Sequence, residues 1–155
     1  PPREPPRHNV NAEAVERLRE AFGGPVFPQG RQGTAGFVRH LRAGGLLVLL
    51  FDQKVHYGRL LPFLGRKAPT ALSAAELAQR YDAVLVPFFA TRRADGLSFD
   101  VVLEAPVDHS DPVTVTVELN RRLEDRVRAT PGQWFWIHRR WQILPGLYAG
   151  EDLAD

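Results

Sequence analysis

Two short stretches of the chain carry side chains that could take part in catalysis. His8 and Glu13 are separated by four residues, and a histidine oriented by a carboxylate is a common general base. With five histidines and eighteen acidic residues, one such pair is expected by chance. Asp52 and Gln53 follow the apolar residues 46–51, and catalytic groups gather where buried strands of α/β sheets end. A cap of a helix or turn by Asp52 is an equally good explanation of its position.

The tryptophans form a second point of interest, because all three lie in residues 131–141, PGQWFWIHRRW. The area that an indole buries favours Trp134 and Trp136 as core residues, and an interfacial belt at a membrane is the alternative. Arg139 and Arg140 follow closely, and we expect one of the two to point toward the rim of the site near Asp52. There they could face an anionic lipid or an acidic protein, or pair with that carboxylate.

Metal, disulfide and nucleic-acid chemistry find little support in the sequence. The chain has no cysteine, which excludes disulfides, thiolate chemistry and cysteine zinc sites. The histidines have no metal-ligand spacing, so we expect no metal site and no cofactor. No nucleic-acid-binding motif is present, although a pI near 9.4 points weakly to anionic partners.

Length and composition favour one folded domain, which we place at residues 1–142 with a tail at 143–155. Hydrophobic residues make up 44% of the 155, enough for a core. No apolar run approaches the roughly 20 residues of a membrane span, and no signal peptide is evident. Methionine is absent and the chain begins PPREPPRHN, so we expect a fragment or a processed piece.

Capping residues and apolar spacing predict the helices. Asn11 can cap the first, and Ser73 with Glu76 forms a capping box at the third. Asp111 and Pro112 can begin a long helix with an apolar stripe repeating every four residues and arginines on its other face. We therefore expect helices at 12–22, 35–43 and 73–81, then the long helix from Pro112 and a helical turn from Pro131.

Apolar runs and one turn predict the strands. Residues 46–51 and 83–89 are nearly continuous apolar runs, as in strands that are buried on both faces. Asp95-Gly96 favours a hairpin turn into a strand at 99–103, whereas residues 60–70, rich in proline, glycine and basic side chains, indicate an ordered loop. The alternation of helices and strands predicts an α/β fold, with a mixed, mostly parallel sheet flanked by helices and an antiparallel late strand.

Five segments, taken in order, resemble one family. They are LREAFGG, LRAGGLLVLLFDQ, LPFLGRKAPT, ELAQRYDAVLVPFFATR and VTVELNRRLEDRVRATPGQWFWIHRRW, and they span about residues 3–141. The chain resembles the C-terminal half of the lipid A biosynthesis lauroyl/myristoyl acyltransferases. This resemblance implies part of a glycerolipid acyltransferase fold. It also implies a peripheral or anchored enzyme at the cytoplasmic face of the inner membrane.

The resemblance implies a reaction and its partners. An O-acyltransferase of this type moves a fatty acyl chain from acyl carrier protein, or from CoA, to a hydroxyl of a glycolipid such as a lipid A precursor. The family's H-x4-D/E block lies upstream of the matched region, so the resemblance makes His8 and Glu13 a coincidence. It also makes residues 26–33, VFPQGRQG, a variable connection despite their likeness to the FPEGTR block of glycerolipid acyltransferases. Without that histidine we expect no acyl transfer by residues 1–155 alone, and a catalytically inactive module that binds lipid or carrier protein is the alternative.

The resemblance also assigns site residues. It implies catalytic roles for Arg19, as fixed positive charge near the reacting carbonyl or a sugar phosphate, and for Asp52, which could orient that arginine or a hydroxyl. We expect the two side chains at one rim of the sheet. The substrate-binding residues that it implies are Gln53, Arg3, Asn9, Phe63, Arg139 and Arg140.

Overall fold

The computed structural model describes residues 23–27, 31–55, 58–108, 111–143, 146 and 148. The chain divides into two compact units, Pro1–Leu47 and Val48–Asp155. Each unit is described by itself. The helix predicted at 12–22 lies outside the described residues.

The first unit contains the helix α2 (Arg31–Arg42). This helix confirms the element predicted at 35–43, although it begins four residues earlier. The Phe27 ring packs edge-on against Phe37, with ring centroids 6.2 Å apart, and lies 5.9 Å from the His40 ring. Gly44, at a φ of 80°, follows the last turn, which is the backbone conformation that ends helices with glycine.

The second unit begins with an antiparallel hairpin where the sequence indicates a loop. Strands β1 (Arg59–Phe63) and β2 (Arg66–Thr70) pair from Arg59 opposite Thr70 to Phe63 opposite Arg66. Leu64 and Gly65 both have positive φ, as the mirror-image two-residue turns of hairpins require. The loop prediction is wrong because prolines in both strands mask the pattern, and a two-stranded ribbon tolerates them since each strand is an edge.

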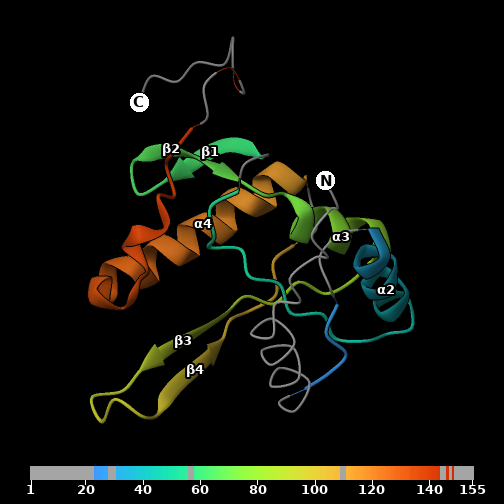
Figure 1. The fold of residues 1–155 in the computed structure, drawn as a ribbon, viewed down its shortest axis with the longest axis horizontal. Helices are drawn as coiled ribbons and strands as arrows, with labels where there is room; N and C mark the ends of the chain where they lie inside the picture. The colour runs from blue at the N-terminus through green and yellow to red at the C-terminus, as the bar shows by residue number, and fades with distance from the viewer. Residues whose placement is uncertain are drawn as a thin grey trace, which may run out of the picture. The chain divides into compact units, whose positions relative to one another are not determined.

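The long helix α4 (Pro112–Ala129) confirms the prediction closely and supports this hairpin (Figure 1). The Asp111 carboxylate caps it by accepting from the Thr114 backbone N–H at 2.9 Å. Its apolar stripe is buried as expected, and the C-terminal part of that stripe packs with Phe63 and Ala68 of the hairpin. The buried stripe residues are Val115, Leu119, Leu123 and Val127.

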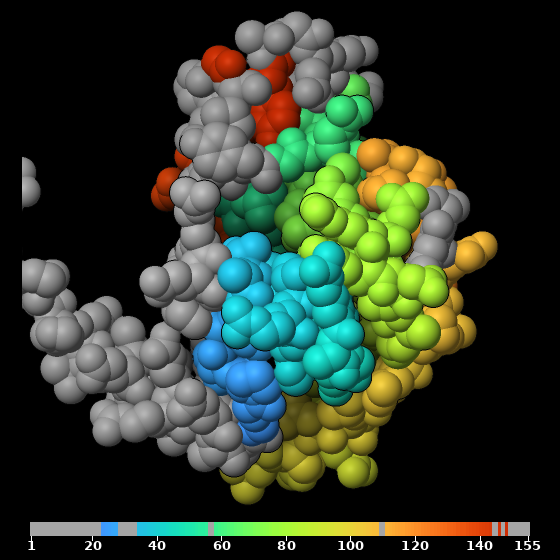
Figure 2. Space-filling model, turned by 90° about the vertical axis from the view of Figure 1, so that its right-hand side faces the viewer, coloured from blue at the N-terminus to red at the C-terminus, as the bar shows by residue number. Residues whose placement is uncertain are grey.

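The helix α3 (Ser73–Tyr81) packs against α4, and Figure 2 shows the two side by side. Its bounds match the prediction, but Ser73 lies inside the helix rather than capping it, so the predicted capping box is absent. Ala75 forms a second core cluster with Val107, Val115 and Leu119. The predicted helical turn is also present, as the 3-10 helix η1 (Pro131–Gln133), and η2 (Trp136–His138) follows it.

A second antiparallel hairpin consists of β3 (Phe88–Arg92) and β4 (Phe99–Leu103). The predicted turn is confirmed: Gly96 has a φ of 72°, and the Asp95 carboxylate accepts from the backbone N–H groups of Leu97 and Ser98. Every residue of β4 is exposed, including the apolar ones. The hairpin therefore forms as the sequence predicts but buries little of its apolar surface.

The mostly parallel sheet is not found, because the described strands form two separate antiparallel pairs. Residues 46–51 form no strand, and of residues 83–89 only the end belongs to β3, with an isolated bridge from Leu85 to Val107. Continuous apolar runs suggest buried strands, but a strand also requires a neighbour for its backbone groups. Helices and sheets are both present, and the described residues do not confirm a glycerolipid acyltransferase fold.

The described helices bear on the question of a membrane span. Within the described ranges, none is both long enough and apolar enough to cross a membrane.

Candidate functional site

The segment after residue 51 meets the segment that contains the tryptophans, more than 80 positions further along the chain. The Lys54 backbone N–H donates to Nδ1 of His138 at 3.2 Å, which requires the neutral ring to carry its proton on Nε2. The Lys54 ammonium donates to Oε1 of Gln142 at 2.6 Å. Asp52 is partly buried at a bend in this segment, and Gln53 is exposed. These contacts join the segment that contains Asp52 to the segment that contains Arg139 and Arg140.

Arg140 is the most deeply buried charged side chain among the described residues, at 1% exposure. Its guanidinium donates to the Pro69 carbonyl and, at 2.9 Å, to Oγ1 of Thr70. It also lies over the Phe63 ring, 5.4 Å from the centroid, in cation–π geometry. These contacts attach the C-terminal segment to strand β2.

The charge of Arg140 is only partly compensated. Burial lowers the pKa of Arg140 to about 10, and the negative charge of Asp52 opposes that shift. The group therefore remains a cation at neutral pH. Its Nε has no hydrogen-bond partner. Asp52 thus lies within electrostatic range of a fixed buried cation, but the Arg140 guanidinium donates to Pro69 and Thr70, so the expectation that one of the two arginines points toward this acid stays a prediction.

Arg139 has the opposite environment. It is exposed and has a φ of 49°, the left-handed conformation, which turns the chain directly before Arg140. Adjacent arginines therefore have different roles: Arg140 is fixed inside the protein, and Arg139 is available to solvent.

The three tryptophans and Phe63 form one aromatic cluster. Phe63 lies 5.4 Å from Trp134 and 5.7 Å from Trp141, measured between ring centroids, and Trp134 lies 4.8 Å from Trp136. Trp141 donates from Nε1 to the Phe63 carbonyl at 3.1 Å. Trp134 is partly buried, as expected, but Trp136 is 50% exposed, so the prediction that both are mostly buried is wrong for Trp136. The Trp134 indole covers the core, and the Trp136 indole packs edge-on against it.

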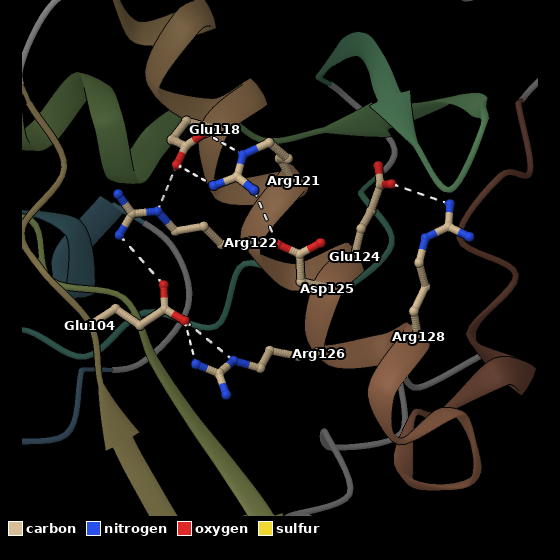
Figure 3. Close-up of polar contacts among 8 residues, drawn as sticks. All are labelled: Glu104, Glu118, Arg121, Arg122, Glu124, Asp125, Arg126 and Arg128. Carbon is tan, nitrogen blue, oxygen red and sulfur yellow. Dashed lines mark hydrogen bonds and ion pairs between the residues drawn. The ribbon is translucent and has the colours of Figure 1, made fainter.

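The arginine face of α4 serves a different purpose, because all four of its arginines pair with carboxylates (Figure 3). Glu104, directly after β4, accepts from Arg126 at 2.6 Å and from Arg122 at 3.4 Å. Glu118 accepts from Arg121 and Arg122, which lowers the pKa of Glu118 to about 2. This network ties the second hairpin to the helix, so the guanidiniums of Arg121, Arg122 and Arg126 are occupied within the protein, whereas Arg128 has only a 3.6 Å pair with Glu124.

The remaining predicted residues have the following positions. Arg3, Asn9 and Arg19 lie outside the described residues, as do His8 and Glu13, so the predicted pairing of Arg19 with Asp52 stays a prediction. Phe63 is wholly buried and packs between Trp134 and Trp141. Its role in substrate binding also stays a prediction.

Sequence reasoning missed three contributors to this region. Thr70 and Lys54 were overlooked because their partners lie about 70 to 90 residues away. Asn120 is buried on the helix and donates to the Pro62 carbonyl at 2.9 Å, while its own Oδ1 has no partner. The position of Asn120 directly after Leu119 of the apolar repeat was the one available signal for this contact.

Metal ligation finds no support in this part of the molecule. Among the described residues no three His, Cys, Asp or Glu side chains are grouped so that they could hold a metal ion. The region combines one carboxylate, one buried guanidinium, a histidine and a lysine. It can hold and orient an anionic or hydroxyl-bearing group.

Comparison with known proteins agrees with the resemblance. Over 87 residues the chain is 30% identical to the lipid A biosynthesis lauroyltransferase of Escherichia coli (strain K12). The match covers 54% of this chain and 28% of that relative's length. The family model for bacterial lipid A biosynthesis acyltransferases matches residues 5–143, which is nearly the whole chain and includes Asp52, Lys54 and the tryptophan segment. On that match, the chain belongs to the bacterial lipid A biosynthesis acyltransferase family.

Proposed function

We propose that this chain is part of an O-acyltransferase that moves a fatty acyl chain from a thioester donor to a hydroxyl of a glycolipid of the lipid A type. The observation that carries the proposal is the family match over residues 5–143. The donor is acyl carrier protein or CoA, and the acceptor is a lipid A precursor or a related glycolipid. The proposed location of the reaction is the cytoplasmic face of the inner membrane.

The reaction needs charge stabilisation and one proton acceptor. The acceptor hydroxyl oxygen attacks the thioester carbonyl carbon, negative charge builds on the carbonyl oxygen, and the thiolate of the donor leaves. A base takes the hydroxyl proton, and the departing sulfur takes up a proton. Histidine is the usual base, but the two described histidines already bond backbone groups of this chain, His40 with Leu46 and His138 with Lys54.

The described residues fit a role in positioning. Asp52 lies in the electrostatic field of Arg140, and its carboxylate oxygens can accept from an acceptor hydroxyl or from Arg19. Gln53 is exposed beside it and can donate and accept hydrogen bonds. In this arrangement Arg140 acts through Asp52, and Asp52 contacts the substrate or the cationic group next to it.

The test uses the natural polypeptide that contains residues 1–155, assayed for transfer of a labelled acyl chain from acyl carrier protein or CoA to a lipid A precursor. Asp52→Asn should lower turnover at least about tenfold because it removes the charge that orients the partner group, while leaving the melting temperature nearly unchanged. Asp100→Asn is the matched control, an exposed carboxylate on β4. Equal turnover in the two variants would remove Asp52 from the mechanism.

A second function stays possible for the same surface, namely a module that holds lipid or carrier protein without transfer. The exposed rings of Phe135 and Trp136 and the exposed Arg139 favour such binding. Binding of a lipid A precursor or of acyl carrier protein, with no turnover by the natural polypeptide under any donor, would select this alternative. Turnover that depends on Asp52 would select the enzyme.

A further inference from the structure

Three consecutive apolar side chains are exposed at the turn that contains η2. Phe135 is 61% exposed, Trp136 is 50% exposed and Ile137 is 77% exposed. A soluble surface normally scatters its exposed apolar residues, whereas a contiguous group marks a contact site. We call these three residues the aromatic tip.

The aromatic tip is held rigidly. The Trp136 indole donates from Nε1 to the Pro131 carbonyl at 2.7 Å, so its polar atom is satisfied inside the protein. Its ring packs edge-on against Trp134 and nearly parallel to Trp141. The tip therefore presents apolar ring surface without an unpaired donor, and little conformational entropy is lost when a partner covers it.

A shallow groove of about 350 Å³ lies beside the tip. Its walls are the Trp136 and Trp141 rings with Leu64, Val127 and Pro131, and the guanidinium-bearing residues Arg66 and Arg128 complete it. Among the described residues, no carboxylate lines this groove. Arg128 has one weak partner, Glu124 at 3.6 Å, and its side chain is 63% exposed.

These features select the kind of partner. Apolar rings flanked by exposed arginines match the boundary between acyl chains and headgroups of a bilayer, where tryptophan and arginine are favoured together. The groove has room for a hydrocarbon chain, and Arg66, Arg128 and the exposed Arg139 can meet anionic headgroups. We propose that the aromatic tip inserts into an anionic lipid surface, with these three arginines on the phosphates.

Arg140 does not take the role of facing an anionic lipid that its sequence position suggests. Arg140 is buried against β2 and cannot reach a headgroup, so the electrostatic part of binding falls to its neighbour Arg139 and to the arginines of the groove. The proposal names the lipid-contacting surface of the proposed enzyme, but it stands on exposure and charge and does not require acyl transfer.

The test is cosedimentation of the chain with vesicles of phosphatidylcholine and phosphatidylglycerol, and with vesicles of phosphatidylcholine alone. We expect binding to the anionic vesicles that weakens with salt, and quenching of tryptophan fluorescence by lipids brominated near the carbonyl. The double variant Phe135→Ser/Ile137→Ser should bind at least about tenfold more weakly, because the inserted apolar area is lost. Arg66→Glu/Arg139→Glu should lose the preference for anionic vesicles.

Matched controls lie in the turn between β3 and β4, away from the aromatic tip. Leu97 is 87% exposed and Arg93 is largely exposed, so Leu97→Ser and Arg93→Glu are controls for the single variants Ile137→Ser and Arg139→Glu, because each removes one exposed apolar side chain or reverses one exposed charge on another surface. These variants should bind like the parent chain, and near-ultraviolet circular dichroism should confirm that all variants are folded.

Three outcomes would overturn the proposal. The first is no binding of the parent chain to anionic vesicles, and the second is an equal loss in tip and control variants. The third is unchanged vesicle binding in tip variants that no longer bind acidic acyl carrier protein, which would identify a protein as the partner. Because no acyl donor is present, a failure of the proposed transferase activity would not affect any of these results.

Discussion

The two hairpins of the second unit have opposite relations between composition and burial. Strands β1 and β2 contain three basic residues and two prolines, yet Phe63 and Ala68 are 0% exposed. Strand β4, FDVVL, is almost entirely apolar, yet Leu103 is 71% exposed. The more polar hairpin is the one that contributes to the core.

The difference arises from what lies against each hairpin. The first packs on the apolar stripe of α4 and is covered by the tryptophan segment, which also bonds it through Arg140. In the described residues the second touches the core mainly through Phe89, and Glu104 joins it to α4 by ion pairs. Apolar composition supplies surface that can be buried, but a complementary neighbour decides whether burial occurs.

The largest test of this comparison is the same truncation in both hairpins. Phe63→Ala should destabilise the protein by about 3–5 kcal/mol, because it opens a cavity inside the aromatic cluster. Phe99→Ala, at a residue that is 49% exposed, should cost less than about 1 kcal/mol. Urea unfolding followed by tryptophan fluorescence measures both. Similar losses would mean that the second hairpin is buried as deeply as the first.

A smaller effect is expected at the arginine that joins the tryptophan segment to the first hairpin. Arg140→Ala should cost about 2–3 kcal/mol, because the Pro69 carbonyl and the Thr70 hydroxyl lose their donors inside the protein. Arg139→Ala is the adjacent control and should change stability by less than about 0.5 kcal/mol. Equal melting temperatures of the two alanine variants would contradict a structural role of Arg140.

The ion pairs of Glu104, which join the second hairpin to α4, should contribute less to stability. Glu104→Gln should cost about 1–2 kcal/mol, because the acceptor of two contacts to α4, at a site that is 18% exposed, loses its negative charge. Asp100→Asn, which loses only the exposed 3.7 Å pair with Arg93, should be nearly silent. Hydrogen exchange in β3 and β4 should accelerate in Glu104→Gln alone. Equal exchange rates in the two variants would contradict a role of Glu104 in holding the second hairpin.

The smallest effect is a dependence of stability on pH at Glu118. Its hydrogen bonds with Arg121 and Arg122 lower the folded-state pKa from 4.5 to about 2, so their contribution is complete above pH 4.5 and is lost as the pH falls toward 2. Because the side chain is a third exposed, we expect at most about 1 kcal/mol. Thermal melts of the parent chain and of Glu118→Gln between those pH values should converge at the acidic end. Parallel curves would show that the pairs contribute nothing.

The sequence predicted the helices and turns that are stabilised by residues close together in the chain. The cap and stripe of α4, the bounds of α3 and the turn at Asp95-Gly96 all follow from residues within a few positions of each other. For the site, Asp52 lies within electrostatic range of Arg140, while the direct pairing of Asp52 with an arginine of the last segment or with Arg19 stays a prediction.

The sequence by itself determined the helices, one hairpin turn, the family and the group of residues from which a site could be built. Only the tertiary structure decided that residues 60–70 form a buried hairpin, and that Arg140 is buried while Arg139 is exposed. It also decided that Trp136 lies at the surface. The physical reason is range: caps and turns are satisfied within one or two turns of chain, whereas burial depends on partners about 70 residues away.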